Sequence, residues 1–242
     1  AGVRGNHAGV TENELSTDLA VHRHGRPPGP GVPTLFLLLG LSKISTVFSM
    51  FGFIAVYWSI HGWPLAVGLA GTLYVHEMGH VAMLRRLGIH AVAPLFIPGV
   101  GAVVMLRGHI VDPVLEARIG LAGPVWGLSA AVVAWIVHVA TGAGIWLAIA
   151  ELTAFLNLFN LIPIWQLDGS RGFHALNTAQ RWAAVAAIGV IFWMTGVKLL
   201  VLVAAVGIFR AWEGRQAEPE GGVLTAFVVL TLAHTLLAGI PV

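Results

Sequence analysis

The stretch LYVHEMGHVAML, residues 73–84, places two histidines and a glutamate inside a run that is otherwise as apolar as a membrane span. Ionisable side chains at such depth are energetically costly unless a partner compensates them, and within membrane helices they mark functional sites by default. The stretch therefore predicts a helix of a membrane domain that carries a site for chemistry.

The composition of the chain favours a membrane protein. Of its 242 residues, 57% are hydrophobic and only 10% are charged, unlike a soluble domain. We expect an all-α polytopic fold that crosses the lipid bilayer several times, in a bacterial cell membrane. Because the chain has no cysteine, a metal ion would be held by nitrogen and oxygen ligands. The net charge of +2 is too small to favour nucleic acid as a partner.

Five windows have the length of about 20 apolar residues that a helical span requires. They lie at about 34–60, 64–84, 116–140, 143–164 and 222–240. The run 181–212 is too long for one ordinary span and is interrupted at Thr195 and Gly196. A hairpin of two short helices there places nearly all Lys and Arg residues on one side of the membrane, whereas a single long helix does not. We therefore favour seven membrane helices over six.

Two regions differ from these spans. Residues 1–33 are polar and then rich in Pro and Gly, which predicts an N-terminal tail ahead of a membrane-embedded domain at 34–242. The segment 89–113 mixes prolines and glycines with β-branched residues, which predicts short strand-like pieces in a re-entrant segment. Its Gly99 and Gly101 either receive an unwound substrate as an added strand or belong to a loop that plugs a cavity.

The motif HEMGH has the spacing of a metal site. His76 and His80 are four residues apart, so on a helix they lie on one face, with Glu77 beside them. Two imidazoles at this spacing can coordinate one metal ion, which is usually zinc. A bound metal also compensates both histidines at once in an apolar environment.

A catalytic zinc site has three protein ligands, so a third ligand is needed. Asp168 and Glu151 are the two acidic residues that lie neither in polar tails and loops nor at the mouth of a span. Asp168 follows the end of a span that returns to the basic side of the membrane, close to the depth of His80, whereas Glu151 lies deeper. Depth therefore favours Asp168.

The combination of HExxH in one span with NxxPxxxLDG, here NLIPIWQLDG at 160–169, resembles the site-2 protease family of intramembrane zinc metallopeptidases. The segment ARIGLAGP, residues 117–124, looks like the small-residue segment that opens the next helix of that family's core. The resemblance runs from about residue 64 to residue 175. Where some members of the family continue LDGGR, this chain reads LDGSRG.

Carried over residue by residue, the resemblance implies one zinc ion on His76, His80 and Asp168, with Glu77 as general base. Asn160 lies inside the motif, and we expect it to donate a hydrogen bond to the ligands or to the developing oxyanion. Asn157, one turn earlier, either faces the same site, where it could contact substrate, or makes an ordinary hydrogen bond between helices.

The resemblance implies an intramembrane zinc endopeptidase that cuts transmembrane segments of other membrane proteins near the cytoplasmic face. A second hypothesis is a metal-binding but non-proteolytic membrane subunit that acts as a scaffold in a larger complex, although a scaffold would not need Glu77. A zinc transporter is disfavoured because the ligands cluster at one depth. The sequence makes no prediction of the oligomeric state.

Overall fold

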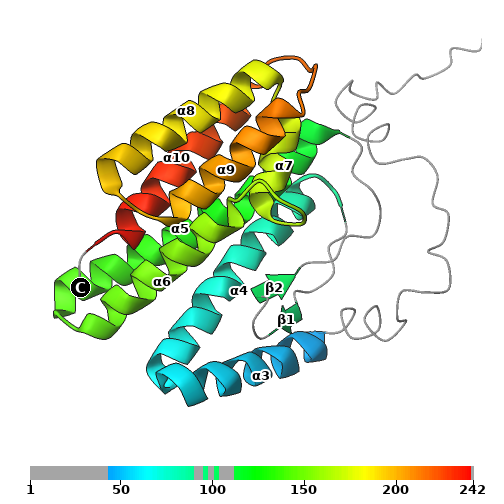
Figure 1. Ribbon diagram of the computed structural model, residues 1–242. Coiled ribbons are helices and arrows are strands. Elements are labelled where there is room, and N and C mark those ends of the chain that lie inside the picture. Colours follow the sequence, from blue (N-terminus) through cyan, green and yellow to red (C-terminus); the bar gives the residue numbers. More distant parts are fainter. Residues whose placement is uncertain (1–42, 90–94, 98–100, 104–111, 241–242) are drawn as a thin grey trace, which may run out of the picture.

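The computed structural model describes residues 43–89, 95–97, 101–103 and 112–240 (Figure 1). These residues form a predominantly helical fold with one short antiparallel ribbon. The helices are α3 (Lys43–His61), α4 (Trp63–Arg86), α5 (Pro113–Thr141), α6 (Gly144–Asn160), α7 (Asp168–Ala175), α8 (Thr178–Thr195), α9 (Leu199–Trp212) and α10 (Gly221–Ala238). The predicted tail at 1–33 lies outside the described residues, so the domain division stays a prediction.

Helix α5 is the central element of the fold. It packs against α4, α6, α7 and α10, and Figure 1 shows α3 and α4 on one side of the α5–α6 pair and α8, α9 and α10 on the other. The N-terminus of α5 is capped by Asp112, whose Oδ1 accepts hydrogen bonds from the backbone of Val114 at 2.8 Å and Leu115 at 3.4 Å. Asp112 is therefore the N-cap residue of α5.

Two of the described helices, α5 and α10, are long and apolar enough to cross a membrane. Three further apolar stretches are shorter, at Thr46–His61, Gly144–Asn160 and Leu199–Trp212. Large apolar side chains are exposed on several helices, with Phe48, Trp193 and Trp212 at 74%, 85% and 80%. Exposed apolar surface of this extent favours a lipid or protein neighbour over water.

The predicted break in the run 181–212 is confirmed. Helix α8 ends at Thr195, and Gly196 has a left-handed φ of 68°, with its N–H donating to the carbonyl of Phe192 at 2.8 Å. A glycine in this conformation ends a helix at low steric cost, and α9 then begins at Leu199. The single long helix is therefore wrong, while the number of membrane crossings stays a prediction.

The segment 89–113 contains the ribbon. Strand β1 (Leu95–Ile97) pairs antiparallel with β2 (Gly101–Val103), in the register Leu95↔Val103 and Ile97↔Gly101. Strand β1 lies against α3 and β2 against α4, as Figure 1 shows. The ribbon therefore lies beside the helix that carries HEMGH.

A buried arginine forms hydrogen bonds with the C-terminal end of α7. Arg181 on α8 is 3% exposed, and its Nε donates to the carbonyls of Phe173 and Leu176 at 3.2 and 3.0 Å. Its guanidinium also donates to the carbonyl of Arg210 at 2.7 Å, at the end of α9. These three carbonyls lie at helix ends, where helical donors are missing. Arg181 thereby joins α7, α8 and α9 and helps to place α7, which begins at Asp168.

Candidate metal centre

The two histidines of HEMGH lie on one buried face of α4. His76 and His80 are 2% and 6% exposed, and their Nε2 atoms are 3.1 Å apart. The ring centroids are 4.9 Å apart, with an angle of 76° between the ring planes. Helical spacing alone brings the rings together, because residues four apart are neighbours on a helix surface.

Asp168 reaches the histidines from a distant part of the chain. Helix α6 ends at Asn160, and residues 161–167 turn the chain so that α7 starts with Asp168. A Cβ on Gly169 would overlap the carbonyl of Leu161, so the turn needs a residue without a side chain directly after the aspartate. The glycine of the LDG motif is thus required by the close approach of two backbone segments.

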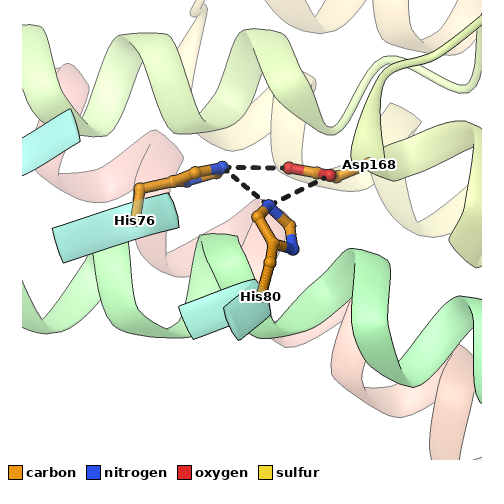
Figure 2. Close-up of side chains that lie close together, drawn as sticks. All are labelled: His76, His80 and Asp168. Carbon is orange, nitrogen blue, oxygen red and sulfur yellow. Dashed lines mark hydrogen bonds and ion pairs between the residues drawn. The ribbon is translucent and has the colours of Figure 1, made fainter. Parts of the chain in front are cut away.

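Three ligand atoms converge, as Figure 2 shows. Oδ2 of Asp168 is 3.1 Å from Nε2 of His76, and Oδ1 is 3.4 Å from Nε2 of His80. Asp168 is 7% exposed. In a tetrahedral zinc site with bonds of about 2.0–2.1 Å, neighbouring ligand atoms are about 3.3 Å apart. The spacing of these three side chains therefore fits a small divalent metal ion, and among the described residues this is the one cluster that does.

The hydrogen bonds of the two rings decide which atoms face the centre. Nδ1 of His80 is 2.8 Å from the carbonyl of Ile119, and Nδ1 of His76 is 2.7 Å from Oδ1 of Asn157. Both oxygens only accept, so each Nδ1 carries the proton and donates. In the neutral rings both Nε2 atoms then present lone pairs to each other and to a carboxylate. Three acceptors facing one another require positive charge between them, which either protons on the rings or one bound metal ion supplies.

The electrostatics of Asp168 agree with this assignment. Burial by itself raises the pKa of its carboxyl, but the positive charge of His80 and hydrogen bonds from His76 and His80, which are protonated on Nε2 when no metal ion is bound, outweigh burial and hold the pKa well below its usual range. Asp168 is therefore ionised at neutral pH. An ionised carboxylate is the form that binds a metal ion.

Glu77 lies beside the ligands without joining them. It is 4% exposed, and its Oε1 is 4.0 Å from Nε2 of His76. A carboxylate at this distance does not share the point where the three ligand atoms converge. It can instead face a water molecule or substrate held next to that point, which is the place of a general base.

The two asparagines are in different environments. Asn157 is 1% exposed, and its Nδ2 donates to the carbonyl of Thr153 at 2.8 Å, so its Oδ1 is the atom that faces His76. Asn157 therefore contacts Nδ1 of His76, the ring nitrogen that points away from the other two ligand residues. Asn160 is half-buried, and no hydrogen bond joins its side chain to the residues that the structure describes. Its catalytic role stays a prediction, as does substrate contact by Asn157.

Two glycines of α5 provide the space for this arrangement. A Cβ on Gly123 would overlap Nε2 of His80 and crowd Nε2 of His76, and a Cβ on Gly127 would overlap the amide of Asn157. Their spacing of four residues on one helix face is the signal that pointed to close contact. What they contact follows only from the packing of α5 on α4 and α6.

The remaining predicted site residues lie elsewhere. Glu151 is not part of the metal cluster, and its Oε1 is buried without a hydrogen-bond partner among the described residues. Gly101 begins β2, and Gly99 lies outside the described residues. Their role in binding substrate stays a prediction.

The site thus belongs to a recognisable class: a buried cluster that could hold a divalent metal ion, with two histidines of HExxH on one helix, an aspartate from a second helix and the carboxylate of Glu77 beside them. No family model matches the chain. Curated sequences and a solved structure are similar to it.

The putative zinc metalloprotease Rip3 of Mycobacterium tuberculosis is 35% identical over 126 residues, which cover 48% of this chain and 31% of that protein. The zinc metalloprotease MJ0392 of Methanocaldococcus jannaschii is 26% identical over 147 residues, which cover 59% of this chain and 39% of that protein. The chain therefore spans about a third of the length of these curated relatives. Their names confirm the resemblance to zinc metalloproteases that the two motifs indicated.

A solved structure, the site-2 protease from Methanocaldococcus jannaschii, matches 73% of this chain and 89% of that one. The identity is 22% and the TM-score is 0.39.

Proposed function

We propose that this chain is a site-2-type zinc metalloprotease, an intramembrane endopeptidase that hydrolyses peptide bonds in or near transmembrane segments of membrane proteins. The observation that carries the proposal is the convergence of two imidazole lone pairs and one carboxylate at 3.1–3.4 Å, with Glu77 beside them. The names of the curated relatives support zinc as the metal and proteolysis as the reaction.

His76, His80 and Asp168 would hold one zinc ion. Bound zinc lowers the pKa of its water to about 7 and polarises a peptide carbonyl. Glu77 accepts a proton from the attacking water and later delivers it to the leaving amine, so that the two products separate as an acid and an amine. Asn157 and the carbonyl of Ile119 keep both imidazoles in the orientation that directs Nε2 to the centre.

The proposed setting is a multi-pass protein of a bacterial cell membrane. The apolar length of α5 and α10, the shorter apolar helices around them and the exposed apolar side chains support this setting. The predicted placement of nearly all Lys and Arg residues on one side of the membrane supports a site near the cytoplasmic side, because Lys and Arg concentrate there. Membrane proteins with a transmembrane segment are the proposed substrates, and the strands β1 and β2 the proposed place of their attachment.

A non-proteolytic scaffold subunit is the second candidate. A scaffold could bind the same metal ion but would not need the buried carboxylate of Glu77, which lies 4.0 Å from Nε2 of His76. The position of Glu77 therefore favours the protease. Burying a carboxylate without a function is costly in an apolar helix.

The deciding experiment compares Glu77→Gln with the unaltered chain in liposomes that contain a panel of single-span membrane proteins. We expect the variant to keep about one zinc ion per chain and to lose cleavage by about 100-fold or more, because general-base catalysis contributes about 10²–10⁴-fold. Zinc is measured by elemental analysis and cleavage by electrophoresis of the panel.

Glu151→Gln is the matched control, since it also neutralises a carboxyl in an apolar helix but lies outside the metal cluster. It should retain both zinc and cleavage. Full cleavage by Glu77→Gln would refute the mechanism. Stoichiometric zinc without cleavage of any panel member by the unaltered chain would favour the scaffold.

A further inference from the structure

His234 is a buried histidine of α10 that the proposed mechanism does not use. It is 0% exposed, and its Nε2 is 3.0 Å from the carbonyl oxygen of Pro124 on α5. A carbonyl oxygen only accepts, so Nε2 carries the proton and donates. Nδ1 of the same ring is buried and has no hydrogen-bond partner among the described residues. The ring therefore makes one directed contact, and that contact is with another helix.

The other polar side chains in the buried face of α10 behave differently. Thr231 and Thr235 are also 0% exposed, but their hydroxyls donate to carbonyls of their own helix, those of Phe227 at 2.8 Å and Thr231 at 2.6 Å. Among the hydrogen bonds found for α10 side chains, the bond of His234 alone reaches a neighbouring helix. A threonine can satisfy itself in an apolar helix, whereas a histidine needs an external acceptor.

The acceptor belongs to a turn of α5 that lacks one of its own backbone hydrogen bonds. Pro124 lies inside the helix and has no N–H, so the carbonyl of Gly120 loses the donor that would normally follow four residues later. Gly120 and Gly123 in the same turn add backbone conformational freedom. A helix turn that lacks one of its own hydrogen bonds depends more on its neighbours for a fixed geometry.

The same turn faces the metal centre. The carbonyl of Ile119 accepts the hydrogen bond from Nδ1 of His80 at 2.8 Å. The backbone of Gly123 lies so close to Nε2 of both ligand histidines that a Cβ there would overlap or crowd them. A small shift of residues 119–124 would therefore rotate His80 and change the space around the ligand atoms.

We propose that His234 is a positioning residue for the metal centre: through the bond from Nε2 to Pro124, it holds the proline-weakened turn of α5 in the place that orients His80 and leaves room for both ligand nitrogens. This inference rests on the proposed metal centre. It assigns to α10, which contributes no ligand, a direct influence on the affinity and geometry of the metal site.

The test uses the full chain in detergent and compares His234→Leu, His234→Gln and His234→Asn. A glutamine amide places an N–H near the position of Nε2, whereas the shorter asparagine amide corresponds to Nδ1 and does not reach Pro124. Zinc affinity is measured by chelator competition, and the ligand geometry by the visible absorption of the cobalt-loaded protein. Thr235→Val is the matched control, because Thr235 is equally buried on the same helix but bonds only within α10.

We expect His234→Leu and His234→Asn to weaken zinc binding by about tenfold, the lower end of the effect of residues that orient metal ligands, and to shift the cobalt spectrum. His234→Gln and Thr235→Val should keep the affinity and the spectrum of the unaltered chain. If His234→Leu fails to fold, the difference in zinc affinity and cobalt spectrum between His234→Gln and His234→Asn tests the inference.

Equal affinities and spectra for all variants, or equal losses for glutamine and asparagine, would overturn the inference. Neither result affects the proposed function, provided that the unaltered chain binds zinc. Failure of the unaltered chain to bind zinc would instead remove the proposed function and this inference together.

Discussion

At the scale of single residues, the proposed metal centre depends on groups that are not themselves ligands. Oδ1 of Asn157 accepts a hydrogen bond from Nδ1 of His76 at 2.7 Å, and the carbonyl of Ile119 accepts one from Nδ1 of His80 at 2.8 Å. Each bond fixes which ring nitrogen carries the proton and hence which one is free to bind an ion. The ligands and the residues that orient them form one unit.

Asn157→Leu should lower zinc affinity by about 10- to 100-fold, because the substitution leaves Nδ1 of His76 without its acceptor. Chelator competition on the purified variant measures the effect. Asn157→Asp retains an oxygen acceptor and should lose much less. Asn160→Leu is the control on the same helix: as the catalytic role predicted for Asn160 requires, it should reduce cleavage while leaving zinc affinity unchanged.

Gly123→Ala should abolish zinc binding, because a methyl group at this position overlaps Nε2 of His80. Alanine has a higher intrinsic helix propensity than glycine, by about 1 kcal/mol. A loss of zinc binding in this variant would therefore result from the steric overlap and not from a less stable helix. Gly189→Ala, on the exposed face of α8, meets nothing within 4 Å and should bind zinc normally. Normal zinc content in Gly123→Ala would contradict the described packing of α5 on α4.

At the scale of elements, α7 is the helix whose placement matters most. It spans Asp168–Ala175 and carries the one ligand that does not come from α4. Its first turn depends on the close approach of Gly169 to Leu161, and its last turn on Arg181. The Phe173 ring packs edge-on against Phe227 of α10, with centroids 5.0 Å apart. Contacts at both ends of a short helix thus hold the third ligand.

Arg181→Met should lower the free energy of unfolding by about 2–4 kcal/mol, because it leaves buried carbonyl oxygens without donors at the ends of α7 and α9. Denaturant unfolding in detergent measures the change, and zinc affinity should fall with it. Arg210→Met is the comparison, since the ion pair of Arg210 with Glu213 is partly exposed and contributes about 0–1 kcal/mol. Equal stabilities for the two variants would contradict the role assigned to Arg181.

The elements themselves were largely predictable from the sequence. The apolar windows, the break at Gly196 and the strand-forming segment near Gly101 follow from hydropathy, turn chemistry and β-branched residues, all of which act over a few neighbouring positions. The contact of α10 with Pro124 was not predictable in this way. No local pattern shows which of several apolar helices lies behind a given turn.

At the scale of the whole molecule, the proposed metal ion would join distant segments. Asp168 lies 88 residues or more from both histidines along the chain, so one ion would link α4 to the region after α6. Helix α5 runs between these parts and contacts both α4 and α7. Binding of an ion to the folded site alone should therefore stabilise the entire bundle.

Zinc at 100 times its Kd should stabilise the folded protein by about 2.7 kcal/mol, and removal by a chelator should reverse the effect. Thermal unfolding in detergent, with and without zinc, measures the shift in Tm. Glu77→Gln should keep the shift because Glu77 is not a ligand. His80→Ala should lose it, and a full shift in that variant would contradict the ligand assignment.

The sequence by itself predicted the three side chains that converge: the spacing of His76 and His80 places both rings on one face of any α-helix, and the expected depth of Asp168 put it at the same level. The tertiary structure alone decided that Asn157 orients His76, that Gly123 makes room for the ligand atoms and that His234 supports the turn behind them. Helical periodicity is a local property of the chain. The rotation of one helix against another depends on the packing of every side chain between them, which no short stretch of sequence contains.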